Sequence, residues 1–307
     1  MAYPIEKKLV VAVASSALFD LTESDSIFRA KGLQHYKEYQ KKNIDKPLDR
    51  GVAFPFVRRL LKLNESFPEF SPVEVVLMSK NSPETGMRAF NSIKHYGLDI
   101  SRAGFTSGKP HYQYLPSFNT SLFLSANEED AANAISNGFA AGRVLNKIVV
   151  DDIDDLELRL AFDFDGVLAD DEAEKVYKHS DLKSFHNHES EHACEPLNNG
   201  PVIELLKKIS MFQRLEKKRM AEDNTYTPII KTAIVTARNA PAHERMINTL
   251  NHWDIDIDEA FFLGGIDKSR ILNVMKPHIF FDDQLVHLEQ LDKVPAVHIP
   301  FGIANKK

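Results

Sequence analysis

The chain has 307 residues, about twice the commonest domain size, so one large domain or two domains of medium size are expected. With 43% hydrophobic and 27% charged residues it has a globular composition, which excludes a disordered or fibrous chain. The net charge of −6 argues against binding to a nucleic acid polymer, because such binding needs a dense basic face. One cysteine excludes an intramolecular disulfide, and no apolar run reaches the roughly 18 residues of a membrane span. We therefore expect a soluble, cytoplasmic protein that does not insert into a membrane.

The first apolar run resembles a secretory signal, because Lys7 and Lys8 precede the stretch LVVAVASSALF. Short runs rich in Val and Ala also form buried strands of parallel sheets. The single cysteine and the repeat described next favour the second interpretation. We expect a strand over Lys8–Val13.

A repeat of domain size relates the two halves of the chain. At a shift of 157 positions, eight of the 21 residues that begin at Arg88 are identical to their counterparts in the second half. Average composition would give roughly one or two identities. Earlier in each half the shift is 149, which places an insertion of eight residues within 212–228. We expect two similar lobes, 1–147 and 148–307.

Within each lobe, β-branched runs alternate with helical stretches. This alternation predicts an α/β fold in which helices cover both faces of a parallel sheet. Ligands of such sheets bind beyond the carboxyl ends of the strands, so chemistry is expected at the residues that follow each apolar run. The expected strands are Lys8–Val13, Val73–Met78, Leu158–Phe164, Lys231–Val235 and His278–Phe281, and the expected helices include Phe54–Asn64 and Pro241–Trp253.

Two carboxylates, Asp163 and Asp165, end the first apolar run of the second lobe. If the chain turns at Asp165, the two groups can converge on one ligand, with Asp163 as nucleophile and Asp165 as acid and base. Paired acids repel each other, and a divalent cation would relieve that repulsion. A simple turn with Asp near Gly is the alternative, and this pattern alone leaves both open.

Three weaker signals follow later runs of the same lobe. Thr236, with the backbone N–H groups after it, beginning at Ala237, can hold a phosphate oxygen. Lys268 opens a helical stretch and, taken alone, is expected to be solvated. The adjacent acids Asp282 and Asp283 end a fully apolar run, which requires a cation or cationic group facing them.

In the order DxD…T…K…DD, these residues resemble the haloacid-dehalogenase-like (HAD-like) phosphohydrolases. From about position 18 to 302 the sequence is similar to that of the cytosolic 5′-nucleotidase type I family. The stretches that carry this resemblance include FPFVRRLLKLN, VVLMSKN, LRLAFDFDGVLADDEAE, IVTAR and KPHIFFDDQLVH. Phe164 and Gly166 follow the more general superfamily form. The resemblance implies a HAD-like Rossmannoid sheet with a small helical cap at about 171–199. It also implies Mg²⁺-dependent hydrolysis of AMP-like nucleoside 5′-monophosphates.

The resemblance further implies a role for each residue. Asp163 attacks phosphorus to form an aspartyl-phosphate, and Asp165 protonates the leaving group and then activates water. The phosphoryl oxygens are held by Thr236, the amide of Ala237 and Lys268. The Mg²⁺ ligands implied are Asp163, the backbone carbonyl of Asp165 and Asp282, with Asp283 orienting a ligand of the ion.

Two other functions stay open at this stage. The same motifs suit a phosphatase of another small phosphomonoester, such as a sugar phosphate, because they specify phosphoryl transfer and not the leaving group. A non-catalytic nucleotide-binding regulator is the other alternative, and the complete set of motifs counts against it. A homo-oligomer is compatible with the sequence.

The first lobe lacks the catalytic groups. We therefore expect a catalytically silent copy that completes the pocket, binds a regulatory nucleotide or stabilises its partner. The positions that align with the catalytic groups hold, in chain order, Ala14, Ser16, Ser79, His111, Ser125 and Ala126.

The stretch His188–His192 matches the zinc-protease pattern HExxH. Its surroundings are polar and Pro196 follows closely, unlike the embedded helix of a zinc protease, so we expect a solvated helix. Tyr177, His179 and Phe185 in the same segment could stack on a base, but packing is the favoured interpretation.

Overall fold

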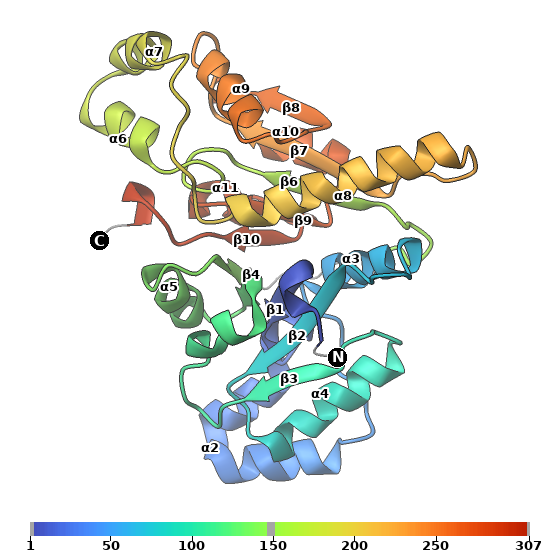
Figure 1. Ribbon diagram of the computed structural model, residues 1–307. Helices are drawn as coiled ribbons and strands as arrows, with labels where there is room; N and C mark the ends of the chain where they lie inside the picture. Colours follow the sequence, from blue (N-terminus) through green and yellow to red (C-terminus); the bar gives the residue numbers. More distant parts are fainter. Residues whose placement is uncertain (1–2, 146–150, 306–307) are drawn as a thin grey trace. The chain divides into compact units, whose positions relative to one another are not determined.

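The computed structural model describes residues 3–145 and 151–305, and the chain divides into two compact units, Met1–Asp151 and Asp152–Lys307 (Figure 1). The boundary predicted at 147/148 falls within 146–150, outside the described residues. Each unit contains a parallel sheet, which confirms the predicted α/β class.

In the first unit, the strands run parallel in the order β3-β2-β1-β4-β5. All of β1 is buried between β2 and β4, which confirms the strand interpretation of the signal-like run. The strands are β1 (Leu9–Val13), β2 (Val73–Ser79), β3 (Arg102–Phe105), β4 (Thr120–Ser125) and β5 (Ala141–Val144). The helices are α1 (Ser15–Leu18), α2 (Thr22–Lys42), α3 (Phe54–Ser66), α4 (Pro83–His95) and α5 (Glu128–Ser136).

In the second unit, the strands run parallel in the order β8-β7-β6-β9-β10. This is the same order as in the first unit, with β6 to β10 in the places of β1 to β5, as a duplication predicts. The strands are β6 (Leu158–Phe162), β7 (Ile230–Thr236), β8 (Glu259–Phe262), β9 (Ile279–Asp282) and β10 (Ala296–His298). The helices are α6 (Glu172–His179), α7 (Leu182–Glu191), α8 (Ile203–Glu222), α9 (His243–His252), α10 (Ser269–Met275) and α11 (Leu285–Glu289).

The insertion predicted within 212–228 lengthens one helix. Helix α3 has 13 residues, whereas its counterpart α8 has 20 and ends at Glu222. The added turns bring Glu216 to the start of β7, where its carboxylate accepts the backbone N–H groups of Ile229 and Ile230. The insertion therefore extends a helix rather than a loop.

Equivalent side chains make equivalent hydrogen bonds in the two units. Arg88 Nε donates to the carbonyl of Lys46, and Arg245 Nε donates to the carbonyl of Glu195, both at 2.9 Å. The duplication stays a prediction, and these bonds support it because they join positions related by the shifts of 157 and 149. Two further pairs are the bonds of Asn91 to Ile44 and Asn248 to Ala193, and those of Leu48 to Ser92 and Leu197 to Thr249.

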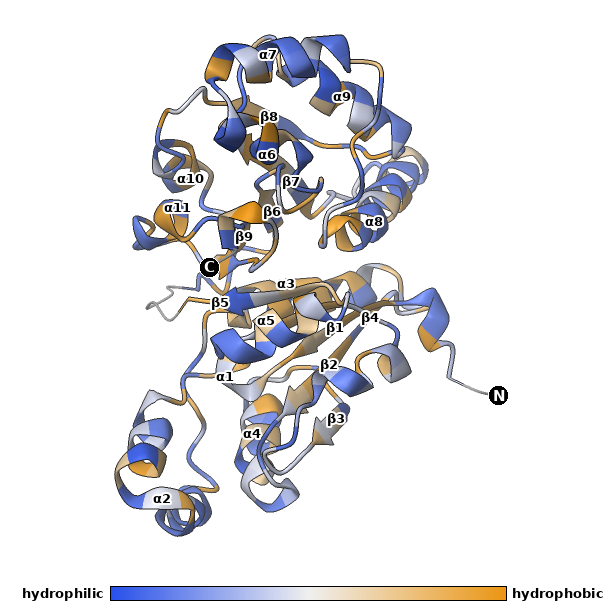
Figure 2. Cartoon of the chain, turned by 90° about the vertical axis from the view of Figure 1, so that its left-hand side faces the viewer, coloured by the Kyte–Doolittle hydropathy of each residue, from blue (hydrophilic) through white to orange (hydrophobic). Residues whose placement is uncertain are grey.

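The core of each unit lies along its sheet. Strands β1 and β2 are apolar and buried, whereas the outer helix α2 is mostly hydrophilic (Figure 2). In the second unit, the rings of Phe162 and Phe281 on neighbouring strands stack with centroids 5.1 Å apart. The buried strands fix the position of the side chains at their carboxyl ends.

Among the described residues, no helix has the length and apolar character to span a membrane.

Candidate active site

The carboxyl ends of the strands β6 and β7 line a pocket of about 390 Å³. Strand β6 lies between β7 and β9, so the residues that follow these three strands are neighbours. Of the residues predicted for the site, the pocket is lined by Asp163, Asp165, Thr236 and Ala237. Thr236 is buried and its Oγ1 accepts the N–H of Arg238. The structure therefore brings both acids of the DxD motif and the first residues after β7 to one cavity.

Lys268 lies buried between two carboxylates behind this pocket. Its Nζ is 2.8 Å from Asp163 Oδ2 and 2.7 Å from Asp282 Oδ2. Burial disfavours the ammonium, but the two carboxylates outweigh burial and raise the pKa of Lys268. The expectation of a solvated lysine is wrong, because the chain before α10 directs the side chain to the ends of β6 and β9.

The two carboxylates that Lys268 joins differ in their electrostatics. Burial raises the pKa of Asp163 to about 6, with Lys268 opposing the effect and Asp282 adding to it. Burial also acts on Asp282, but Lys268 and His287 outweigh it and lower its pKa. His287 Nδ1 lies 3.1 Å from Asp282 Oδ2, and the N–H of Gln284 donates to Oδ1. Asp282 is thus held as an anion, whereas the pKa of Asp163 lies at about 6.

The side chain of Asp283 is buried, and its carboxylate lacks hydrogen-bond donors among the described residues. Burial and the charges of Asp163 and Asp282 raise its pKa to about 10. A Cβ at Gly166 would lie 2.5 Å from Asp283 Oδ2, and Gly166 has a φ of +73°, so this turn requires glycine. The DxDG turn and the acid pair therefore pack directly against each other.

Asp165 is held by a second charged group. Nε and Nη2 of Arg238 donate to its two oxygens, each at 2.7 Å. Nη1 of Arg238 donates to Glu189 and, at 3.0 Å, to the carbonyl of Ala242. Glu189 is fully buried and also accepts from Nη1 of Arg245 at 2.9 Å. Burial disfavours the guanidinium of Arg238, but Asp165 and Glu189 outweigh burial and raise its pKa.

Within the HExxH stretch Glu189 is buried, whereas the other four residues are exposed or half-buried, so the expectation of a solvated helix is wrong at Glu189. Glu189 faces two arginines of the protein interior, which a polar sequence pattern does not reveal. The rings of His188 and His192 stack on each other with centroids 4.3 Å apart. Among the described residues, the one group that could hold a metal ion is Asp163, Asp282 and His287, whose ligand atoms lie within 4.8 Å of one another.

The outer wall of the pocket comes from α6 and α7, which lie in the segment predicted as a cap. Tyr177, Lys178 and Phe185 line the cavity. The rings of Tyr177 and Phe185 are 6.1 Å apart, edge to face, and Phe185 is buried whereas Tyr177 is 52% exposed. Phe185 thus packs as expected, whereas Tyr177 presents much of its ring to solvent. His179 is not among the residues that line the pocket.

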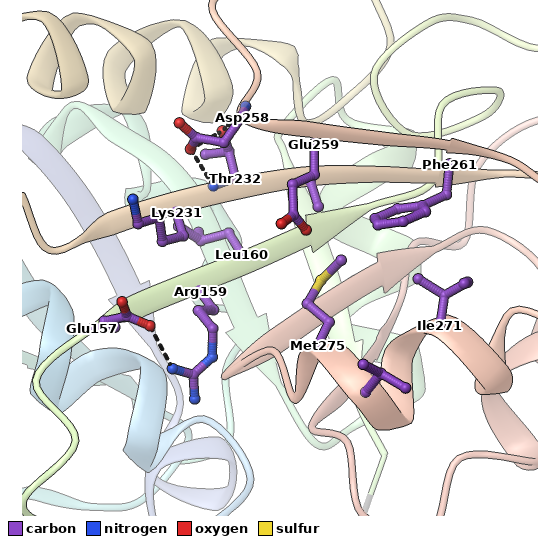
Figure 3. A pocket seen from close by; sticks show the side chains of 12 residues that line it. Glu157, Arg159, Leu160, Lys231, Thr232, Asp258, Glu259, Phe261, Ile271 and Met275 are labelled. Atoms are coloured by element: carbon purple, nitrogen blue, oxygen red, sulfur yellow. Dashed lines mark hydrogen bonds and ion pairs between the residues drawn. The ribbon is translucent and has the colours of Figure 1, made fainter.

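A second pocket of the same unit, of about 460 Å³, lies at the opposite ends of the strands (Figure 3). Two of its charged side chains have partners within the pocket: Arg159 donates to Glu157, and Asp258 accepts the N–H of Thr232. It contains none of the predicted site residues. Its position at the amino ends of the strands makes it a poor candidate for the chemistry of this chain.

At the matching end of the first sheet, the positions that align with the catalytic acids hold Ala14, Ser16, Ser125 and Ala126. Ser15 and Ser79 hydrogen-bond to each other at 2.9 Å, and Ser125 contacts Asp130. Burial lowers the pKa of His111, which occupies the position that aligns with Lys268. In the described part of this unit no group of acids and histidines has the spacing of a metal site.

Several features of the site were not predicted from the sequence: the contacts of His287, Arg238 and Glu189. Arg238 stands two residues after Thr236, in the motif IVTAR, but its partners lie 73 and 49 positions away. The repeat holds a signal that could have found them, because the aligned positions of Arg238 and Glu189 are the neutral residues Asn81 and Gln40.

Comparison with known proteins agrees with the family suggested by the sequence. A profile of the 5′-nucleotidase family matches residues 1–306. The chain is 36% identical over 305 residues to cytosolic 5′-nucleotidase 1B of Homo sapiens, an alignment that covers 97% of this chain and 49% of the relative. The chain thus spans about half the length of that curated relative. No solved structure gives a significant match. Together with the acids, threonine and lysine gathered at one edge of the second sheet, the profile identifies the chain as a member of the 5′-nucleotidase family.

Proposed function

We propose that the chain is a Mg²⁺-dependent 5′-nucleotidase that hydrolyses AMP-like nucleoside 5′-monophosphates through an aspartyl-phosphate. The observation that carries this proposal is the ion-paired cluster of Asp163, Lys268 and Asp282 beside the pocket, in a chain of the 5′-nucleotidase family. The HAD-like fold and a cytoplasmic location belong to the same proposal. The first is supported by the strand order and the second by the name of the cytosolic relative.

The charges of the cluster fit a divalent cation. Three buried carboxyl groups, Asp163, Asp282 and Asp283, face one ammonium, so two negative charges would lack a counterion if all three were ionised. The carboxylate oxygens of Asp283 have no hydrogen-bond partner among the described residues, and a cation bound nearby would interact favourably with them. Mg²⁺ prefers oxygen ligands, which Asp163, Asp282 and the backbone carbonyl of Asp165 would supply. When bound, the ion would offset the negative charge of the transferring phosphoryl group.

Asp163 is the nucleophile in this proposal. Its carboxylate oxygen attacks phosphorus, the bond from phosphorus to the 5′ oxygen breaks, and Asp165 gives that oxygen a proton. Asp165 then removes a proton from a water molecule, which attacks the aspartyl-phosphate. The bond from Asp163 to phosphorus breaks, and inorganic phosphate leaves with Asp163 restored.

The phosphoryl oxygens require donors that are already in place. Thr236 and Ala237 line the pocket at the end of β7, and the Nζ of Lys268 reaches Asp282 at the end of β9. Fixed donors of this kind stabilise the transition state without reorganisation, and one such donor is typically worth about 3 kcal/mol. The nucleoside would occupy the outer part of the pocket, near Tyr177 and Lys178.

The test is phosphate release from a panel of nucleoside 5′-monophosphates and sugar phosphates, with and without EDTA. We expect release from nucleotides, inhibition by EDTA and recovery on addition of Mg²⁺. A preference for sugar phosphates would favour the alternative, a phosphatase of another small phosphomonoester. Nucleotide binding without phosphate release would favour a non-catalytic regulator. Activity unaffected by EDTA would refute the metal.

A further inference from the structure

Three ionisable side chains form a chain of contacts from the predicted cap to the second acid of the DxD motif, Asp165. Asp165 follows β6, Arg238 follows β7, and Glu189 lies on α7. The guanidinium of Arg238 uses its Nε and both terminal nitrogens in hydrogen bonds, two of them to Asp165 and one to Glu189. The side chains of Arg238 and Glu189 are 2% and 0% exposed. Arg238 therefore joins Asp165 to a residue of α7.

The surroundings of Arg238 leave it little freedom. Its guanidinium carbon lies 5.2 Å from the ring centre of Phe164 and 5.8 Å from that of Phe185. These rings pack near the guanidinium, while Asp165, Glu189 and the carbonyl of Ala242 take its N–H groups. A bidentate contact to Arg fixes the plane of a carboxylate and occupies one lone pair of each oxygen. The remaining lone pairs of Asp165 stay free for a reacting group.

The first unit shows what this arrangement looks like without the chemistry. There Gln40 occupies the position of Glu189 and bonds to Arg88, just as Glu189 bonds to Arg245. A neutral side chain is therefore sufficient for the contact with this arginine. Asn81 stands at the position of Arg238 and accepts a hydrogen bond from Tyr36.

Aligned positions of the two units differ in charge at the residues that are proposed to take part in the chemistry. They agree in charge at a residue that serves packing. Asp165, Arg238 and Glu189 have ionisable side chains, and their counterparts Ser16, Asn81 and Gln40 do not. Arg245, by contrast, has Arg88 as its counterpart. The charge of Glu189 therefore goes with the pair of Arg238 and Asp165, and not with the contact to Arg245.

We propose that Glu189 is a positioning residue: through Arg238 it holds Asp165 in the orientation needed to protonate the leaving oxygen. The inference rests on the proposed function, because it assigns a task in that reaction. It also assigns a role to the HExxH stretch, whose glutamate would serve phosphoryl transfer and not zinc binding.

The test compares two substrates that differ in one atom: AMP, and its analogue with sulfur in place of the bridging 5′ oxygen. A thiolate leaves without a proton, so only AMP needs the acid. We measure kcat/KM, which covers the steps up to departure of the nucleoside. For Glu189→Gln we expect a loss of about tenfold to hundredfold with AMP and less than about threefold with the sulfur analogue.

Controls separate this role from a structural one. The Glu189→Gln protein should keep the wild-type circular dichroism spectrum at the assay temperature, because Gln40 makes the corresponding contact with Arg88 in the first unit. Glu191→Gln, on the exposed side of the same helix, should change neither kcat/KM. Arg238→Lys, which keeps the charge but loses the bidentate contact, should show the same selective loss and serves if the first variant does not fold.

The outcomes are distinct. Equal losses on both substrates, or no loss on either, would overturn the role of Glu189 while leaving the nucleotidase proposal in place. Failure of the wild-type protein to release phosphate from any nucleoside monophosphate would instead overturn the proposed function, and the role of Glu189 with it.

Discussion

Replacing Asp283 with Asn tests the charge balance of the site. In the metal-free protein, burial and the neighbouring carboxylates raise the pKa of Asp283 to about 10, so this carboxyl carries a proton at neutral pH. A divalent cation nearby favours the ionised form, and binding it therefore releases the proton. Release of one proton per ion makes the affinity for Mg²⁺ rise about tenfold for each pH unit below that pKa.

The assay is calorimetric titration of the metal-free protein with Mg²⁺ at several pH values between about 7 and 9, in buffers of different ionisation enthalpy. In this range Asp163, whose pKa is about 6, is already ionised and contributes little to the pH dependence. For the wild-type protein we expect the apparent Kd to fall about a hundredfold over two pH units. For Asp283→Asn, which has no proton to release, we expect a change of less than about threefold.

Two controls make the result decisive. Asn has the shape of the protonated carboxyl, so the metal-free variant should unfold within a few degrees of the wild-type protein. Asp254→Asn replaces an acid that is 82% exposed and ion-paired with Arg214, and should keep the wild-type pH dependence. If Asp283→Asn also kept that dependence, the assignment of the released proton to Asp283 would be refuted.

Three further predictions follow from single contacts. Asp163→Asn should abolish phosphate release while circular dichroism stays unchanged, and retained turnover would remove Asp163 from the role of nucleophile. Gly200→Ala should lower the free energy of unfolding by about 1–3 kcal/mol in urea titrations, because the new Cβ would lie 2.6 Å from the carbonyl of Val167; an unchanged midpoint would contradict that crowding. Burial raises the pKa of Glu216, so the folded protein binds this proton more tightly than the unfolded chain, and its stability should rise as pH falls from neutral toward 4.5. Glu216→Gln should lose this part of the pH dependence, and equal curves for the two proteins would rule out Glu216 as its source.

The strands and the groups at their ends could be predicted, because both depend on local pattern. An apolar run followed by polar residues indicates a buried parallel strand and its carboxyl end, and parallel strands end at one edge of a sheet. That reasoning placed Asp163, Thr236 and Asp282 together before any distance was known. It failed for Lys268, whose helix-opening position looks the same for a solvated lysine as for one that reaches two strand ends.

The contacts of Glu189 and Arg238 could not be predicted from local pattern. A glutamate in a polar helix looks solvated, since burial there depends on two arginines 49 and 56 positions away. The length of α8 shows the same limit: the position of the insertion was predictable, but whether eight residues form a loop or extend a helix depends on what they pack against.

The repeat supplies a comparison that a single domain could not. The bonds of Arg88 and Arg245, and of Asn91 and Asn248, are the same in both units, so these residues serve the fold. The acids of the second unit have no acidic counterparts at the aligned positions of the first, although the strands that would carry them are present and buried. A sheet of this kind therefore folds without these acids, and burying them carries a desolvation cost that their ion pairs with Lys268 only partly offset. Under the proposed function, the presence of these acids in one unit alone is accounted for by the phosphate and Mg²⁺ that this unit would bind.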